Sequence, residues 1–230
     1  GFRDSMRDYI SEKVFDTLQY FNFGGIEVII DEPLPDSINI SSVLKIIEKN
    51  IPKALFEDIK KIHIGDYDFL KERNISALYR DGIMYISNKQ SDFKDLLDDI
   101  IHEIAHHTEE KLPEMIYGDQ LVKREFLNKR KQLEFELRSE GYWTQEYDFE
   151  KIKFDQDFDT FLYKRLGKRM LRMVTSGMFI RPYASVALRE YFATGFEAYY
   201  LSTEKRDDLF QISPELFKKI DDIDKKLKSY

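Results

Sequence analysis

The chain has 230 residues and no cysteine. Disulfides, thiolate metal sites and cysteine nucleophiles are therefore excluded together. This absence does not fix the compartment, because secreted proteins can also lack cysteine. Long apolar runs are missing as well: stretches such as residues 25–30 are far shorter than the roughly 18 residues that a membrane span needs. No membrane span is therefore expected.

The first residues, Gly1 to Asp4, do not have the charged and apolar regions of a signal peptide. We therefore expect no signal peptide in this chain, and a trimmed targeting segment stays an open alternative. The localisation is also open, since a secreted factor, a toxin delivered into a host cell and a phage-type protein all fit the composition.

Basic residues are outnumbered by acidic ones, 36 Lys and Arg against 43 Asp and Glu, which gives a net charge of −7. A protein whose main task is to hold nucleic acid is usually basic, so no nucleic-acid partner is expected. The basic run at residues 123–131 is the best argument to the contrary. We interpret this run as the solvated face of an amphipathic helix. Binding of nucleic acid through residues 119–131 stays as an alternative, which a strong salt dependence of binding would support.

The hydrophobic content indicates a globular chain rather than a disordered one. Hydrophobic residues make up 42% of the sequence, and 18 Phe and 14 Tyr supply much of this share. β-branched residues predict strands at 26–30 and 59–64. Asp81-Gly82 lies between two further runs of strand type, which is the strongest short-range signal for a β-hairpin. Residues 83–87 form the second strand of this predicted hairpin.

Helical spacing of apolar residues dominates the rest of the chain. It predicts helices at residues 3–21, from 41 or 42 to 47, 92–110, 119–140, 155–176 and 185–202, a helical turn at Pro52, and a final helix from Ser213-Pro214. Residues 141–154 are predicted to be irregular or to form short strands, and residues 177–183 to form a loop. Strands precede helices, so the predicted fold class is α+β, with a small mixed sheet and a mostly helical C-terminal half. We expect a single domain over residues 1–230 with a helical insertion at about 118–175.

Three of the four histidines lie within six residues, at His102, His106 and His107. Residues four apart share one face of a helix, so His102 and His106 can present two imidazole nitrogens to one ion. Glu103 can reach a water on that ion and take its proton. The pattern H-E-x-x-H on a helix therefore predicts Zn²⁺. Chance histidines on an apolar helix face are the alternative, and these would need other partners. His107 is expected to be exposed, or to contact the metal ligands without binding the metal itself.

A third protein ligand must come from another segment. The aromatic-rich helix at 185–202 is expected to be buried, yet it carries Glu190 and Glu197. A buried carboxylate is costly unless it is paired or bound to a metal. Glu190 is the preferred ligand and Glu197 the weaker candidate. The alternative for either is an ion pair with an arginine such as Arg181 or Arg189.

A family resemblance follows from these motifs. H-E-x-x-H at residues 102–106, combined with E-Y-F-A-x-x-F at residues 190–196, resembles the catalytic domain of anthrax lethal factor and the related Pro-Pro endopeptidases. The resemblance covers roughly residues 76–107 and 181–202. It implies a zinc metallopeptidase in which Glu190 is the third ligand. It also implies that Tyr183, seven residues before Glu190, donates a hydrogen bond to the oxyanion.

Two features depart from that family. The family usually has a second glutamate four residues after the ligand, where this chain has Thr194. Thr194 can hydrogen-bond a ligand but supplies no charge. The stretch between the two motifs is also much longer than in lethal factor, which supports the insertion and leaves the substrate undefined.

In zinc peptidases of this kind, an edge strand beside the metal holds the substrate backbone in extended form, by strand addition. Residues 83–87, just before the metal-binding helix, fit this role, and Tyr85 is a candidate for substrate contact. An ordinary core strand is the alternative. The predicted fold thus has an edge strand beside the metal-binding helix.

Together these patterns predict a zinc-dependent endopeptidase acting on a peptide or protein substrate. His102, His106 and Glu190 hold the metal, Glu103 is the general base, and Tyr183 stabilises the oxyanion. The alternative is a catalytically degenerate peptidase fold that serves in binding or assembly, as a toxin's delivery domain or a structural component. Thr194 motivates that alternative. The oligomeric state stays open.

Overall fold

The computed structural model describes residues 19–229 of the chain. Most of the helix predicted at 3–21 lies outside the described residues. Its last three residues are in strand β1 (Gln19–Phe23), so the prediction is wrong there. The reason is that Gly24 and Gly25 turn the chain into an antiparallel hairpin. Asn22 accepts a hydrogen bond from the backbone N–H of Gly25 at 2.8 Å and closes this turn.

The chain divides into two compact units, one up to His107 and one from Thr108. Helix α4 (Phe93–Lys111) contains the division, and the predicted helix at 92–110 is confirmed. The single domain predicted for the whole chain stays a prediction.

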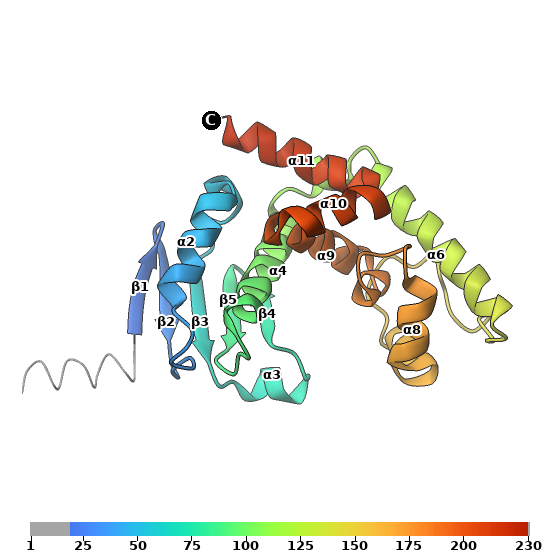
Figure 1. The fold of residues 1–230 in the computed structure, drawn as a ribbon, viewed down its shortest axis with the longest axis horizontal. Coiled ribbons are helices and arrows are strands. Elements are labelled where there is room, and N and C mark those ends of the chain that lie inside the picture. Colours follow the sequence, from blue (N-terminus) through green and yellow to red (C-terminus); the bar gives the residue numbers. More distant parts are fainter. Residues whose placement is uncertain (1–18, 230) are drawn as a thin grey trace, which may run out of the picture. The chain divides into compact units, whose positions relative to one another are not determined.

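The first unit contains a five-stranded mixed sheet in the order β1-β2-β3-β5-β4, drawn as the blue to green arrows of Figure 1. Its further strands are β2 (Ile26–Ile30), β3 (Lys61–Gly65), β4 (Ala77–Arg80) and β5 (Ile83–Ser87). β2, β3 and β5 run parallel, while β1 and β4 pair antiparallel at the two edges. The predicted strands and the hairpin are confirmed. Asp81 and Gly82 both have positive φ, 53° and 81°, as this tight turn requires.

Of our two alternatives for residues 83–87, the edge strand is wrong, because this segment is an internal strand of the sheet. β5 pairs with β3 on one side and with β4 on the other, so both of its backbone edges are occupied. The edge strand is β4, which the hairpin turn folds back along β5. An edge strand does lie beside helix α4, as the fold class predicted, because Tyr79 of β4 hydrogen-bonds His107 of that helix.

Short helices connect the strands of this unit. Helix α2 (Ile40–Asn50) joins β2 to the parallel strand β3. Its N-cap is Asn39, whose side chain accepts from the N–H of Ser42, so the helix begins one or two residues before the predicted start at 41 or 42. Pro52 precedes a single turn of 3-10 helix, η1 (Lys53–Leu55), as expected. Helix α3 (Asp68–Glu72), between β3 and β4, was not predicted.

The second unit is helical throughout its regular structure. Its elements are α5 (Pro113–Tyr117), α6 (Leu121–Ser139), α7 (Gln156–Thr160), the π-helical turn η2 (Phe161–Leu166), α8 (Gly167–Thr175), the 3-10 turn η3 (Pro182–Ser185), α9 (Leu188–Leu201), α10 (Thr203–Ile212) and α11 (Pro214–Lys228). The α+β fold with a helical C-terminal half is therefore confirmed, and residues 141–154 are irregular. Helices α5 and α10 were not predicted. The helix predicted at 155–176 is interrupted at Gly167, whose φ of 79° an ordinary residue rarely adopts.

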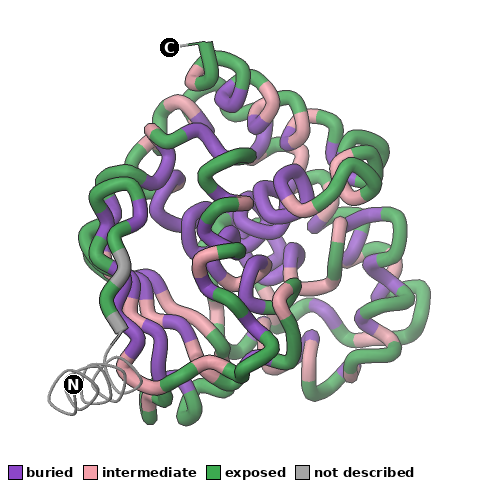
Figure 2. Tube along the Cα trace, turned by 60° about the vertical axis from the view of Figure 1, so that its left-hand side comes forward, coloured by how far each residue is buried: buried purple, intermediate pink, exposed green. Residues whose placement is uncertain are grey.

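Helix α9 is the buried centre of the second unit. It packs against α10, α11, α6 and η3, and twelve of its fourteen residues are buried. Buried stretches of this kind are purple in Figure 2. Close packing on α11 depends on Gly195, because a Cβ there would lie 2.3 Å from Cδ2 of Leu216. None of the described helices is both long and apolar enough to span a membrane.

The basic run on α6 is not only a solvated face, which corrects our interpretation. Arg130 is 1% exposed and donates three hydrogen bonds to the carbonyl oxygens of Ser185 (2.6 Å), Val186 (3.0 Å) and Phe149 (3.2 Å). Its guanidinium also lies 4.3 Å from the ring centroid of Phe158. Burial lowers the pKa of Arg130 from its usual value. Two backbone segments are thereby tied to α6.

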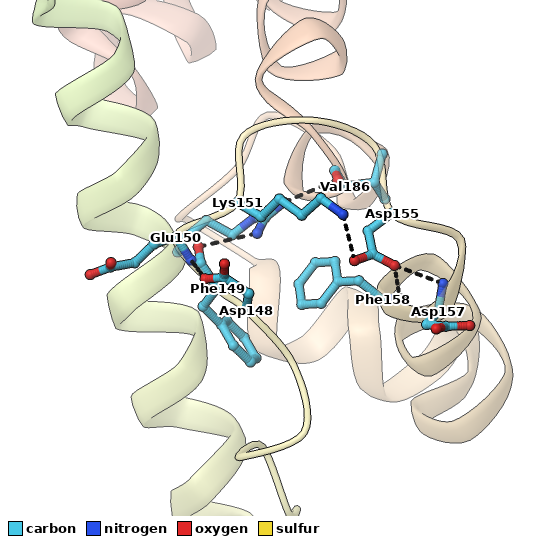
Figure 3. Close-up of polar contacts among 9 residues, drawn as sticks. Asp148, Phe149, Glu150, Lys151, Asp155, Asp157, Phe158 and Val186 are labelled. Atoms are coloured by element: carbon cyan, nitrogen blue, oxygen red, sulfur yellow. Dashed lines mark hydrogen bonds and ion pairs between the residues drawn. The ribbon is translucent and has the colours of Figure 1, made fainter.

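The irregular loop after α6 is held by its own polar contacts, shown in Figure 3. Asp155 accepts from Lys151 at 3.1 Å and caps helix α7 through the backbone N–H of Asp157 at 3.0 Å. The carbonyl oxygen of Ile152 accepts from the N–H of Leu188, the first residue of α9, at 2.9 Å. The loop and Arg130 therefore both fix the segment that leads into α9.

Candidate metal centre

Helix α4 brings two of the predicted ligands together. The rings of His102 and His106 have centroids 4.8 Å apart and are nearly perpendicular, at 86°. Their four-residue spacing places them one turn apart on the same face of the helix. His106 is buried and His102 is half-buried. The pair can therefore offer two imidazole nitrogens to a single ion.

Glu190 completes a group of three. One ligand atom from each of His102, His106 and Glu190 lies within 4.8 Å of the others, so the cluster could hold a metal ion. Glu190 is in the first turn of α9 and is 7% exposed. Two nitrogens and one oxygen form a donor set that suits Zn²⁺.

Glu103 follows His102 directly on α4 and is 5% exposed. A carboxylate so well buried is costly unless other groups compensate its charge.

Tyr183 lies on η3, seven residues before Glu190. Its ring centroid is 6.5 Å from that of Tyr163. Burial raises the pKa of Tyr183 above its usual value, and the negative charges of Glu190 and Asp159 raise it further. The phenol therefore stays protonated at neutral pH and can donate a hydrogen bond. Burial likewise raises the pKa of Tyr163 to about 12.

Glu197, the weaker ligand candidate, lies in an ion pair. Arg181 donates to both of its carboxylate oxygens, at 3.3 Å and 3.1 Å. The Glu197 side chain is 6% exposed and that of Arg181 is 45% exposed. This is the arginine pairing that the sequence left open, and the ligand cluster does not include Glu197. The pair ties the chain just before Tyr183 to helix α9.

Thr194 uses its hydroxyl within its own helix. It donates to the backbone carbonyl oxygen of Glu190 at 2.8 Å and lies 3.2 Å from that of Tyr191. These bonds are to the backbone of Glu190 and not to its carboxylate.

His107 joins α4 to the sheet. Its Nδ1 lies 2.8 Å from the hydroxyl of Tyr79, and its Nε2 lies 2.7 Å from Oδ1 of Asp58. His107 is buried, so it is not the exposed residue that was one of our two expectations. No local pattern pointed to Tyr79 or Asp58, because they lie 28 and 49 residues from His107 along the chain.

Tyr85 lies on the other face of the sheet from this contact. Tyr79 pairs with Met84, the neighbour of Tyr85 on β5, and successive strand residues point to opposite faces. Tyr85 instead stacks on His63, with centroids 5.4 Å apart, and meets Phe69 edge-on at 5.2 Å. The structure therefore does not bring Tyr85 to the side of the sheet that contacts α4.

Sequence reasoning missed Arg130, which positions the segment between Tyr183 and Glu190. Only its place within a basic run was visible, and nothing in such a run distinguishes a buried cation from solvated ones. Lys129 is a second inward cation, since its ammonium donates to the carbonyl oxygens of Met178 (2.6 Å) and Ile212 (2.7 Å).

Comparison of the chain with protein-family models, with curated proteins and with solved structures finds no match. The interpretation of the site therefore depends on its residues and their geometry.

Proposed function

We propose that this protein is a zinc-dependent peptidase. The observation that carries the proposal is the clustering of His102, His106 and Glu190, whose ligand atoms lie within 4.8 Å of one another. Three protein ligands of this type, with one position left for water, are the composition of catalytic zinc sites.

Zinc, when bound, would polarise the scissile carbonyl and lower the pKa of the attacking water. Glu103 accepts the proton of that water and passes it to the leaving amine. Tyr183 donates a hydrogen bond to the oxyanion that develops on the substrate.

The first test is the metal content of the purified chain, with two glutamate variants of the same helix. Glu190→Ala is expected to lose most of the zinc that the native chain holds in a stoichiometric amount. Glu197→Ala is the matched control, since its carboxylate pairs with Arg181, and it is expected to keep the metal. A native chain that holds no zinc and takes up none when it is offered would overturn the proposal.

The second test separates an enzyme from a degenerate fold. Glu103→Gln is expected to keep its zinc and to lose hydrolysis of a mixed peptide library. One observation favours the alternative of a catalytically degenerate peptidase fold. Position 194, where the resembling family has a second glutamate, holds a threonine whose hydroxyl donates to the backbone carbonyl oxygen of Glu190. A zinc-loaded native chain that cleaves no peptide bond would favour this binding or assembly role.

A further inference from the structure

One segment of this acidic protein carries only positive charge. Residues 160–189 contain seven Lys and Arg and not one Asp or Glu, although the whole chain has a net charge of −7. Five of these cations lie within nine residues of η2 and α8: Lys164, Arg165, Lys168, Arg169 and Arg172. We call these five residues the cationic surface.

All five side chains of the cationic surface are exposed. Among the described residues, none of the five forms an ion pair with a carboxylate. The one polar contact of the group is from Arg165, whose guanidinium donates to the hydroxyl of Tyr147 at 3.0 Å. Surface cations normally alternate with acids, so five unpaired cations in close sequence create a local field that attracts negative charge.

The fold concentrates these charges. Lys168 and Arg169 lie one turn before Arg172 on α8, so the three side chains share one side of that helix. Acidic residues at the end of α6 come near α8 on the side of Arg169, because Met173, one turn after Arg169, lines the same hollow as they do. Glu136 and Glu140 line a hollow of about 360 Å³ together with Met173 and Met178.

The cationic surface adjoins the turn that carries Tyr183. Helix α8 packs against η3, and Tyr163, the residue before Lys164, has its ring 6.5 Å from that of Tyr183. The charge of Arg181, two residues before Tyr183, is compensated by its ion pair with Glu197 and does not add to the cationic surface. A polypeptide that passed Tyr183, where the negative charge of Asp159 also acts, and continued along α8 would then meet the cationic surface.

We propose that the cationic surface binds an acidic stretch of the polypeptide substrate. This inference depends on the proposed function, because Tyr183 is the residue that links the surface to the reaction. Asp and Glu side chains would pair with Arg and Lys in partly exposed geometry, which gives orientation and a faster encounter more than great affinity.

A polypeptide fits better than nucleic acid, the other polyanion that such a surface could attract. A domain that holds nucleic acid is usually basic overall, whereas this chain has a net charge of −7. The two inward cations of α6, Lys129 and Arg130, already bind backbone carbonyls and cannot extend the surface.

Binding can be measured without turnover. The full chain with Glu103→Gln is titrated with a fluorescent peptide of alternating Glu and Gly, and with a neutral peptide of Gln and Gly. We expect salt-dependent binding of the acidic peptide only. Lys168→Glu combined with Arg169→Glu and Arg172→Glu is expected to weaken that binding about tenfold or more. The matched control reverses three other exposed lysines, Lys45, Lys49 and Lys94, and is expected to change it less than about twofold.

The outcomes separate this inference from the proposed function. Equal loss in the two triple variants, or no binding of the acidic peptide, overturns the inference even if the native chain cleaves peptides. Tighter binding of single-stranded DNA or of anionic vesicles than of the peptide also overturns it. Where the native chain and both triple variants hydrolyse peptides, kcat/KM for acidic and neutral substrates is compared. The preference for acidic substrates is expected to fall in the variant of Lys168, Arg169 and Arg172 and to stay unchanged in the control variant.

Discussion

The side chain of Arg130 donates from Nε to the carbonyl oxygen of Ser185 at 2.6 Å, across 55 residues of chain. Two further hydrogen bonds from the same guanidinium reach Val186 and Phe149. Ser185 and Val186 lie between Tyr183 and Glu190. A single buried cation thus holds the backbone that carries two residues of the proposed site.

Arg130→Met is expected to lower the free energy of unfolding by on the order of 3 kcal/mol, because three buried carbonyl oxygens lose their donor. Urea unfolding measures this loss. Arg124→Met, an exposed position on the same helix, is the control and is expected to change stability by less than about 0.5 kcal/mol. Similar losses in the two variants would contradict the role assigned to Arg130.

Tyr79→Phe is expected to destabilise the protein by about 1 kcal/mol, because it removes the hydroxyl that hydrogen-bonds Nδ1 of buried His107. Zinc content should not change, since His107 is not one of the proposed ligands. Tyr85→Phe, on the other face of the sheet, is the comparison and should cost less. Loss of zinc in Tyr79→Phe with normal stability would mean that the contact acts on the metal centre instead.

Stability is expected to fall as the pH rises above about 10, the usual pKa of tyrosine. Burial raises the pKa of Tyr200, and so does its hydrogen bond of 2.6 Å to Asp224. The unfolded chain therefore loses its phenolic proton first, which favours unfolding at alkaline pH. The stabilisation is complete below the unfolded-state pKa and disappears as the pH approaches the folded-state pKa.

Urea unfolding across this alkaline range checks the prediction. Tyr200→Phe should make the decline with pH less steep, whereas Tyr20→Phe, at a position that is 56% exposed, should leave it unchanged. An equal slope in native protein and Tyr200→Phe would remove Tyr200 as a source of the effect.

Gly195→Ala is expected to cost about 1–3 kcal/mol, because the new Cβ would lie 2.3 Å from Cδ2 and 2.9 Å from Cγ of Leu216. Leu216→Ala alone leaves a cavity and also destabilises. In the double variant the smaller residue makes room for the new methyl group, so the combined loss should be less than additive. Additive losses in denaturant unfolding would show that the two positions do not compete for space.

The sequence predicted what depends on local pattern. The β-hairpin followed from Asp81-Gly82, and α4 and α9 followed from apolar spacing. The H-E-x-x-H spacing placed His102 and His106 together for the same reason, since a regular helix fixes the separation of residues four apart.

The rest depends on contacts between distant residues. Strand order was not predictable, because the parallel pairing of β5 with β3 leaves no mark within residues 83–87. The burial of Arg130 was hidden for a related reason, since its acceptors are carbonyl oxygens, and every residue has one. Glu190 was the preferred ligand from the sequence, but which glutamate pairs with an arginine could not be predicted until the position of Arg181 was known.

Helix α9 has almost no exposed position at which a substitution would leave the packing unchanged. Of its fourteen residues only Arg189 is exposed, and Leu201 is partly so. A helix with one solvated side tolerates substitutions at every third or fourth residue. This periodicity is what identifies such a helix when related sequences are compared. In α9 this periodicity should be absent, so saturation mutagenesis is expected to show a continuous block of positions that tolerate no substitution. The proposed ligand, Glu190, would not differ from its neighbours in such a profile.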